Sequence, residues 1–332
     1  GRISPIQEEQ MATVEDKNVH TLSVKGTFDD CQDIVKQVFG DVEFNEKYHV
    51  GAVNSINWAR ILAQMTYYFF LYFQLVKQTG NSAIRFVVPS GNFGDILAGY
   101  FAKEMGLPVD KLIIATNEND ILDRFMKSGR YEKAAPGENA EVKATYSPAM
   151  DILISSNFER LLWYLVRGTE AQGDDQKAGE VLSGWMSQLK SSGSVEVPSA
   201  VIEAARKDFD SERVDDKETS ETIKQVYAYD KYVLDPHTAV GVATSYRNIA
   251  RDEKSGAKNI KYISLSTAHP AKFAEVVNQA LNSYEGYSFE KDVLPAELKA
   301  LSTKEKRITL IDEASLEKVK NAIVEGLKQE EN

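Results

Sequence analysis

The sequence contains one cysteine, Cys31, and four histidines among its 332 residues. A single cysteine excludes an internal disulfide framework and is typical of a reducing compartment, so we expect a cytoplasmic protein. So few cysteines and histidines also argue against a zinc cluster, and no bound metal is expected. No run of about 18 apolar residues occurs, so the sequence predicts no membrane-spanning helix.

Positively charged residues are fewer than negatively charged ones. Lysine and arginine number 39 against 50 aspartate and glutamate residues, which gives a net charge of −11. An acidic surface repels phosphate backbones and anionic lipid, so neither nucleic acid nor a membrane is an expected partner. Hydrophobic residues make up 42% of the chain, which excludes an intrinsically disordered protein.

Strand and helix patterns alternate through both ends of the chain. Strands are predicted at 19–24, 84–88, 112–115, 232–234, 262–265 and 307–311. Helices are predicted at 28–39, 57–76, 95–105, 119–127, 236–250 and 270–282, with a final helix after the last strand. This alternation predicts an α/β fold with a mainly parallel sheet and helices on both faces.

The middle of the chain has a different pattern. Residues 151–229 are interpreted as a mostly helical insertion, broken by acidic and basic turns. Residues 1–150 and 230–332 are expected to form the parts of one α/β region. No internal repeat and no low-complexity linker separates these regions.

The segment Pro89 to Asp95 (PSGNFGD) lies between a predicted strand and a helix. Open α/β sheets bind ligands at the carboxyl ends of their strands. Its glycines and Asn92 permit left-handed backbone angles, which lets N–H groups converge on an anion beside a helix N-terminus. Neither G-x-G-x-x-G nor G-x-x-x-x-G-K-[ST] is present. The residues alone leave a phosphate cradle and a plain strand–helix turn equally open.

A second segment, Ser266 to Phe273 (STAHPAKF), also joins a strand to a helix. A hydroxyl of Ser266 or Thr267 either bonds a ring nitrogen of a ligand or caps the helix that begins at Pro270. From the residue types alone, the helix-capping interpretation is somewhat favoured.

Two weaker segments carry two interpretations each, and a third carries one. Asn57 and Arg60 share a helix face, which either holds an anion or combines a cap with a surface arginine. His237 either lies near a site or belongs to a capped helix start. The segment Ser155 to Arg160 most simply begins a helix.

Together these segments resemble the threonine synthase family, most nearly its fungal members. The matching motifs, in the family's order, are GRISPIQ (1–7), GTFDDCQ (26–32), NSINWAR (54–60), PSGNFGDILAGY (89–100), ATNENDILDR (115–124), 155–163, 235–241 and STAHPAKF (266–273). The resemblance is weakest at 130–146, at 168–230 and in the tail.

The resemblance implies a fold-type II pyridoxal-phosphate enzyme, similar to the tryptophan synthase β subunit. Such an enzyme, a carbon–oxygen lyase acting on phosphates, converts O-phospho-L-homoserine and water to L-threonine and phosphate, the last step of threonine biosynthesis. The implied cofactor-phosphate loop is Gly91, Asn92, Phe93, Gly94 and Asp95. Thr267 is implied as the partner of the pyridine nitrogen, and Asn57 with Arg60 as contacts of the substrate's phosphate or carboxylate. The regions 1–150 and 230–332 become the cofactor-binding region.

The family's Schiff-base lysine lies in an N-terminal part beside a Ser/Thr-Gly-rich motif, and neither occurs here. Lys272 matches a family lysine with another role, so no catalytic residue is assigned. We therefore expect the family's N-terminal domain to be missing as a partner, the lysine to lie upstream, and the chain alone to be inactive. Exposed core surface should then reduce solubility.

Two other functions remain open from the sequence. One is a threonine-synthase-like phospho-lyase, which eliminates phosphate to give a 2-oxo acid and ammonia. The other is a non-catalytic fragment that keeps the cofactor loop. Product analysis separates the first from a synthase, and a lysine-bearing upstream domain separates the second.

Overall fold

The structure is a computed structural model that describes residues 3–26, 28–54, 57–80, 83–135, 137–257 and 259–330. The chain forms two compact units. The smaller unit comprises Gly1–Ala52, Ala271–Ala274 and Glu285–Asn332, and the larger comprises Val53–Pro270 and Glu275–Tyr284.

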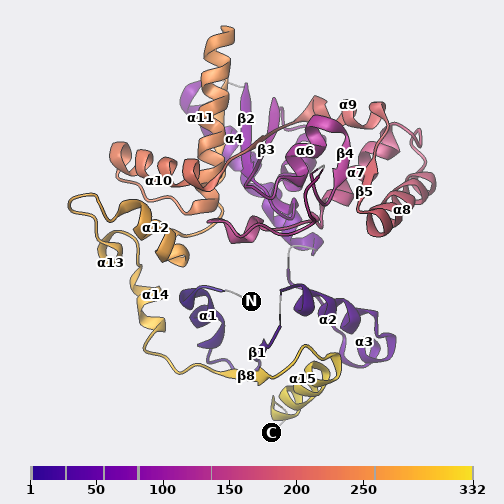
Figure 1. Cartoon of the computed structure of the whole chain (residues 1–332), viewed down its shortest axis with the longest axis vertical. Helices are drawn as coiled ribbons and strands as arrows, with labels where there is room; N and C mark the ends of the chain where they lie inside the picture. The colour runs from indigo at the N-terminus through magenta and orange to yellow at the C-terminus, as the bar shows by residue number, and fades with distance from the viewer. Residues whose placement is uncertain are drawn as a thin grey trace. The chain divides into compact units, whose positions relative to one another are not determined.

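The larger unit is built on a four-stranded sheet in the order β6-β3-β2-β7, and every neighbouring pair is parallel. Figure 1 shows its two central strands, β2 and β3, side by side. Its strands are β2 (Ile84–Pro89), β3 (Lys111–Thr116), β6 (Phe209–Arg213) and β7 (Lys261–Ser264). In the central strand β2, Val87 lies opposite Ile113 of β3 and Ser264 of β7. The β-branched and aromatic residues of this strand favour such a buried position.

The other elements of the larger unit are mostly helices. In chain order they are α4 (Trp58–Thr79), α5 (Gly94–Glu104), α6 (Ile121–Ser128), β4 (Arg130–Glu132), the 3₁₀ turn η1 (Pro148–Met150), α7 (Phe158–Gly168), α8 (Asp175–Ser192), β5 (Ser194–Glu196), α9 (Ser199–Asp208), α10 (Asp216–Asp230), α11 (Pro236–Ser255) and most of α12 (Ala274–Leu281). The short strands β4 and β5 pair antiparallel.

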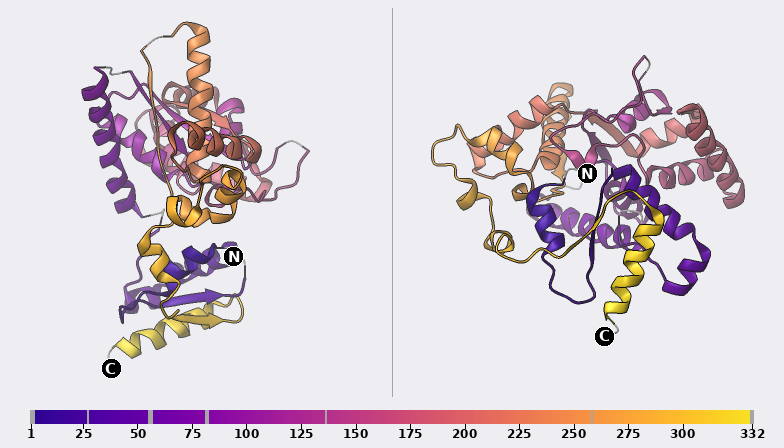
Figure 2. Two further views of the ribbon diagram at one scale, coloured as in Figure 1. Left: turned by 90° about the vertical axis from the view of Figure 1, so that its left-hand side faces the viewer. Right: turned by 60° about the horizontal axis from the view of Figure 1, so that its bottom comes forward.

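Helices cover both faces of the parallel sheet. Phe86 and Val88 of β2 pack in one buried cluster with residues of α4, α5, α6, α7 and α9. Val87 packs on the other face with Val240 of α11. Side chains alternate along a strand, so a strand buried at nearly every position requires cover on both sides. Figure 2 shows α4 and α11 on opposite sides of the sheet. The predicted sheet with helices on both faces is confirmed.

The region 151–229 contains α7 to α10, but it also contributes strand β6 to the main sheet. Burial alternates along this strand, with Phe209 and Ser211 buried and Asp210 exposed. Its exposed polar residues give it a sequence pattern similar to that of the charged helices on either side, so the sequence does not predict it as a strand. The strand predicted at 232–234 is wrong, because these residues form a connection to α11. Val233 and Leu234 are apolar because that connection is buried.

The smaller unit contains α1 (Pro5–Ala12), β1 (Thr21–Val24), α2 (Phe28–Gly40), α3 (Val42–Tyr48), most of the 3₁₀ turn η2 (Pro270–Phe273), α13 (Phe289–Asp292), α14 (Ala296–Leu301), β8 (Ile308–Ile311) and α15 (Leu316–Glu330). Strands β1 and β8 pair with each other in parallel, with Thr21 opposite Ile308. Two strands that the sequence grouped with the main sheet therefore form a sheet of their own.

Across the described ranges, no helix is long and apolar enough to cross a membrane. Within the same ranges, no group of three or more histidine, cysteine, aspartate or glutamate side chains is arranged to hold a metal ion.

Candidate functional site

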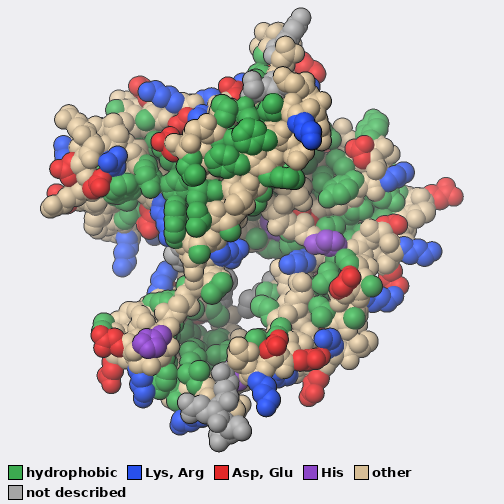
Figure 3. Space-filling view, turned by 180° about the vertical axis from the view of Figure 1, so that it is seen from behind, with side chains coloured by type: hydrophobic (Ala, Val, Ile, Leu, Met, Phe, Trp, Pro, Cys, Tyr) green, Lys and Arg blue, Asp and Glu red, His purple; other side chains and the backbone are tan. Residues whose placement is uncertain are grey.

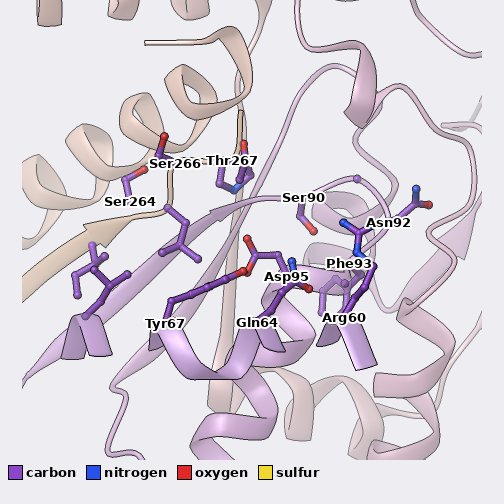
Figure 4. A pocket seen from close by; sticks show the side chains of 16 residues that line it. Arg60, Gln64, Tyr67, Ser90, Asn92, Phe93, Asp95, Ser264, Ser266 and Thr267 are labelled. Atoms are coloured by element: carbon purple, nitrogen blue, oxygen red, sulfur yellow. The ribbon is translucent and has the colours of Figure 1, made fainter. Parts of the chain in front are cut away.

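A cavity of about 670 Å³ opens in the larger unit where strands β2 and β7 end. This is the edge of a parallel sheet at which α/β proteins bind ligands. Three segments line it, as Figure 4 shows: the loop from Pro89 to Asp95, the end of β7 with the residues after it, and one face of α4. The lining residues are Arg60, Gln64, Tyr67, Leu71, 89–95 and 263–267.

The loop between β2 and α5 is held from outside the cavity. The hydroxyl of Ser155 donates to the carbonyl of Gly91 at 2.7 Å. The carbonyl of Asn92 accepts from the backbone N–H of Asn157 at 3.1 Å and from its side-chain amide at 2.9 Å. Ser155 and Asn157 are buried and precede α7. Their bonds occupy the loop carbonyls, while the first N–H groups of α5 have no acceptor within their own helix.

Phe93 stands at the N-cap of α5 with φ 63° and ψ 2°, a left-handed conformation that is rare for a bulky residue. Its ring is buried and packs edge-to-face on Phe158, with centroids 5.1 Å apart, and against Phe209 at 5.8 Å. Strained residues of this kind persist where packing enforces them, and they cluster at functional sites. Aromatic packing thus fixes the direction in which the N-terminus of α5 points.

Gly91 is required by close backbone packing. A Cβ atom at this position would lie 2.8 Å from the carbonyl oxygen of Ala149 and 3.0 Å from the Cα of Met150. Both atoms belong to the backbone of η1, so no side-chain rotation can relieve the contact. The loop therefore takes its path only with glycine at this position.

Asp95 lies in the first turn of α5, and its carboxyl group is engaged by α4. The hydroxyl of Tyr67 donates to Asp95 Oδ1 at 2.5 Å, and that of Tyr68 donates at 3.0 Å. Burial raises the pKa of Asp95, and the two tyrosine bonds oppose that increase only in part. Burial, followed by the charge of Asp95, also raises the pKa of Tyr67. Burial and then the charge of Asp95 raise the pKa of Tyr68 as well, so both tyrosines are protonated donors at neutral pH.

The raised pKa of Asp95 predicts a pH-dependent effect of Asp95→Asn. Because the folded protein holds this proton more tightly than the unfolded chain, the stability linked to it is lost as pH rises above the ordinary value of 3.8. Asparagine keeps the acceptor oxygen and never ionises. The substitution should increase the free energy of unfolding more at about pH 7 than at about pH 4, as measured by urea titration. An equal effect at the two pH values would contradict the assignment.

The opposite end of the cavity carries hydroxyl groups. Ser266 and Thr267 are exposed to the cavity just after β7 (Figure 4). The backbone N–H of Thr267 donates to the hydroxyl of Thr238 at 3.1 Å, which fixes the chain at this point. The predicted loop at 91–95 and the predicted Thr267 thus lie in one cavity, contributed by the ends of two adjacent strands.

The two predicted anion contacts differ in position. Arg60 lines the cavity and is the one cationic side chain among the described residues that do so. Asn57 is not among those lining residues. Its side chain accepts the N–H of Ala59 at 2.8 Å, which is the capping role that the sequence also allowed.

Several site residues were missed from the sequence. Gln64 and Tyr67 follow Arg60 at spacings of four and three along α4, a helical periodicity that could have indicated a shared cavity face. Ser155 and Asn157 were interpreted only as the start of a helix. A pair of polar residues directly before an apolar helix gives no sign of contacts 64 and 65 residues away.

The comparisons agree with this arrangement. The family profile described as "Threonine synthase, C-terminal" matches residues 238–323. Threonine synthase of Saccharomyces cerevisiae is 64% identical over 331 residues, which are 98% of this chain and 63% of that protein.

Two solved structures are similar as well. The crystal structure of threonine synthase from yeast matches with a TM-score of 0.90 and 64% identity, over 99% of this chain and 64% of that one. The structure of PLP-bound threonine synthase from Brucella melitensis matches with a TM-score of 0.80 and 42% identity, over 98% of this chain and 63% of that one. This chain thus spans a little under two thirds of the length of these relatives. The predicted fold class, that of fold-type II pyridoxal-phosphate enzymes, is confirmed, and the chain belongs to the threonine synthase family.

Proposed function

We propose that this chain provides the cofactor cavity of a threonine synthase, which converts O-phospho-L-homoserine and water to L-threonine and phosphate. One observation carries the proposal. The cavity brings the N-terminus of α5, whose first N–H groups have no acceptor within the helix, together with hydroxyl groups at the end of β7, in a volume of about 670 Å³. That space accommodates pyridoxal phosphate together with a small amino-acid substrate.

The loop at 91–95 is suited to act as a cradle for the phosphate of pyridoxal phosphate. The residues proposed to hold it are Gly91, Asn92, Phe93, Gly94 and Asp95. Helix N-terminal N–H groups and the helix dipole favour an anion, and the left-handed Phe93 directs them. The carboxyl group of Asp95 does not compete for these donors, because it accepts from Tyr67 and Tyr68.

The hydroxyl of Thr267 is proposed to bond the pyridine nitrogen. A neutral hydroxyl does not enforce a fully protonated ring, as a carboxylate does, and so moderates the pull on electrons. When bound, the cofactor supplies the electron sink that allows protons to leave the substrate's carbon atoms. Arg60 is proposed to bind the substrate's phosphate or carboxylate as a bidentate donor. Asn57, the predicted second contact of the substrate, caps the turn of α4 that carries Arg60, and is proposed to hold Arg60 in place through that cap.

The proposed reaction also needs a lysine to bond the cofactor and move protons. Among the described residues that line the cavity, none is a lysine. We propose that this lysine belongs to the part of its relatives that the chain does not match, and that the chain alone does not make threonine. After incubation with pyridoxal phosphate and borohydride, no single lysine of the chain should carry a specific reduced adduct. Such an adduct would contradict this proposal.

Exposed apolar side chains on α4 support the proposal that a further segment packs against this helix. Leu62, Phe70 and Phe73 of α4 are exposed by 53%, 60% and 59%. Figure 3 shows hydrophobic side chains gathered on one face of the larger unit. Exposed apolar patches mark interaction surfaces. We propose that the unmatched part of the family's chain covers this stripe of α4.

A chimera tests the function. The part of the S. cerevisiae enzyme that this chain does not match is joined to the chain, and phosphate and amino-acid products are measured from O-phospho-L-homoserine. Threonine and phosphate in equal amounts are expected. A 2-oxo acid with ammonia would instead identify a phospho-lyase. No product from a folded, cofactor-loaded chimera would identify a non-catalytic binding fragment.

A cytoplasmic location remains a prediction from the single cysteine.

A further inference from the structure

A buried polar cluster lies outside the cavity at the start of α11. Its members are Asp235, His237 and Thr238, with exposed fractions of 1%, 4% and 3%. None of the three is among the cavity-lining residues described above. Buried polar groups are costly unless each is satisfied, so the partners of this cluster indicate what it does.

One arm of the cluster leads to the phosphate cradle. His237 Nδ1 lies 3.0 Å from Asp235 Oδ1. A carboxylate only accepts, so Nδ1 carries the proton and Nε2 accepts the backbone N–H of Ala149 at 3.1 Å. Ala149 is the residue whose carbonyl stands directly behind Gly91. The imidazole therefore fixes the backbone against which the cradle packs.

The other arm leads to the hydroxyl end of the cavity. The hydroxyl of Thr238 donates its one proton to Asp235 Oδ2. Its oxygen is thereby oriented to accept the N–H of Thr267 at 3.1 Å. The residue proposed to meet the pyridine nitrogen is thus held by a hydroxyl whose direction Asp235 sets.

Asp235 joins the two arms. Besides His237 Nδ1 and the Thr238 hydroxyl, it accepts the backbone N–H of His237 at 2.9 Å and that of Thr238 at 3.3 Å. These four donors satisfy the hydrogen-bonding capacity of this buried carboxylate. A displacement of this one group would move Ala149 and Thr267 together.

We propose that Asp235 is a positioning residue that sets the spacing between the two ends of the cavity, through His237 to the Gly91 cradle and through Thr238 to Thr267. The proposal deepens the proposed function and rests on it. Because neither arm touches the ligand, the effect should appear as selective changes in affinity for different parts of pyridoxal phosphate.

The test uses the 332-residue chain and isothermal titration with pyridoxal phosphate, pyridoxal and inorganic phosphate. His237→Gln should weaken inorganic phosphate and pyridoxal phosphate about tenfold, the scale of roughly one lost hydrogen bond, and leave pyridoxal unchanged. Thr238→Val should weaken pyridoxal phosphate and pyridoxal by about the same factor and leave inorganic phosphate unchanged. Asp235→Asn should weaken all three ligands, since it alters both arms.

Thr244→Val is the matched control. This threonine is on the same helix, fully buried, with a hydroxyl that has no hydrogen-bond partner among the described atoms. All three affinities should be unchanged. If the single-arm variants lower the melting temperature but weaken all three ligands alike, the positioning role is wrong. If the unmutated chain fails to bind pyridoxal phosphate, the proposed function fails instead, and this proposal with it. Should Asp235→Asn not fold, the two single-arm variants decide.

Discussion

Gly91→Ala is expected to lower the affinity of the chain for pyridoxal phosphate by about 100-fold, which corresponds to losing roughly one hydrogen bond to a charged group. The added methyl group would lie 2.8 Å from the Ala149 carbonyl oxygen, so the loop must move. Isothermal titration of the purified chain measures the loss, and thermal unfolding verifies that the variant folds.

The control for this change is Gly184→Ala. Gly184 lies within α8, and a Cβ atom there would meet nothing within 4 Å. Alanine should leave cofactor affinity unchanged and stabilise the helix by about 1 kcal/mol. An unchanged affinity for Gly91→Ala would show that this loop does not bind the phosphate, because the added methyl group must displace the loop.

Phe93→Ala is expected to lower the free energy of unfolding by about 3–5 kcal/mol, the usual range for deleting a buried phenylalanine. The ring is 2% exposed and contacts Phe158 and Phe209. Its loss should also release the left-handed turn before α5 and weaken inorganic phosphate binding. Urea titration followed by circular dichroism measures the first effect.

Phe70→Ala provides the comparison for stability. This ring is 60% exposed on α4, so its removal should change the free energy of unfolding by less than about 0.5 kcal/mol. Similar losses for the two alanine variants would show that Phe93 has no special role in the core or in the loop.

The position of the loop at 89–95, between a strand and a helix at the lining of the cavity, is predictable because the signal is local. A strand rich in β-branched residues, two glycines and a helix start occur within one short segment, and parallel strands bring such segments to one edge. The same rule places Thr267 in the same cavity. Helix ends are local too: α4 begins after Asn57 and ends at Gly80, whose φ is 68°.

Features that depend on distant contacts are not readable in the same way. The pairing of β1 with β8 joins segments from opposite ends of the chain. Edge strand β6 presents a polar face that resembles a charged helix. Ser155 and Asn157 were interpreted as a helix start because their carbonyl partners lie in another loop. The sequence around His237 allows two roles, because its contact with the backbone N–H of Ala149 spans 88 residues.

The most direct test is the position of the cofactor's phosphate in a crystal structure of this chain with pyridoxal phosphate. The account predicts the phosphate within hydrogen-bond distance of the backbone N–H groups of Gly94 and Asp95, with the ring directed toward Thr267. A phosphate bound elsewhere in the larger unit, or a ring directed away from Thr267 with the cradle empty, would contradict it.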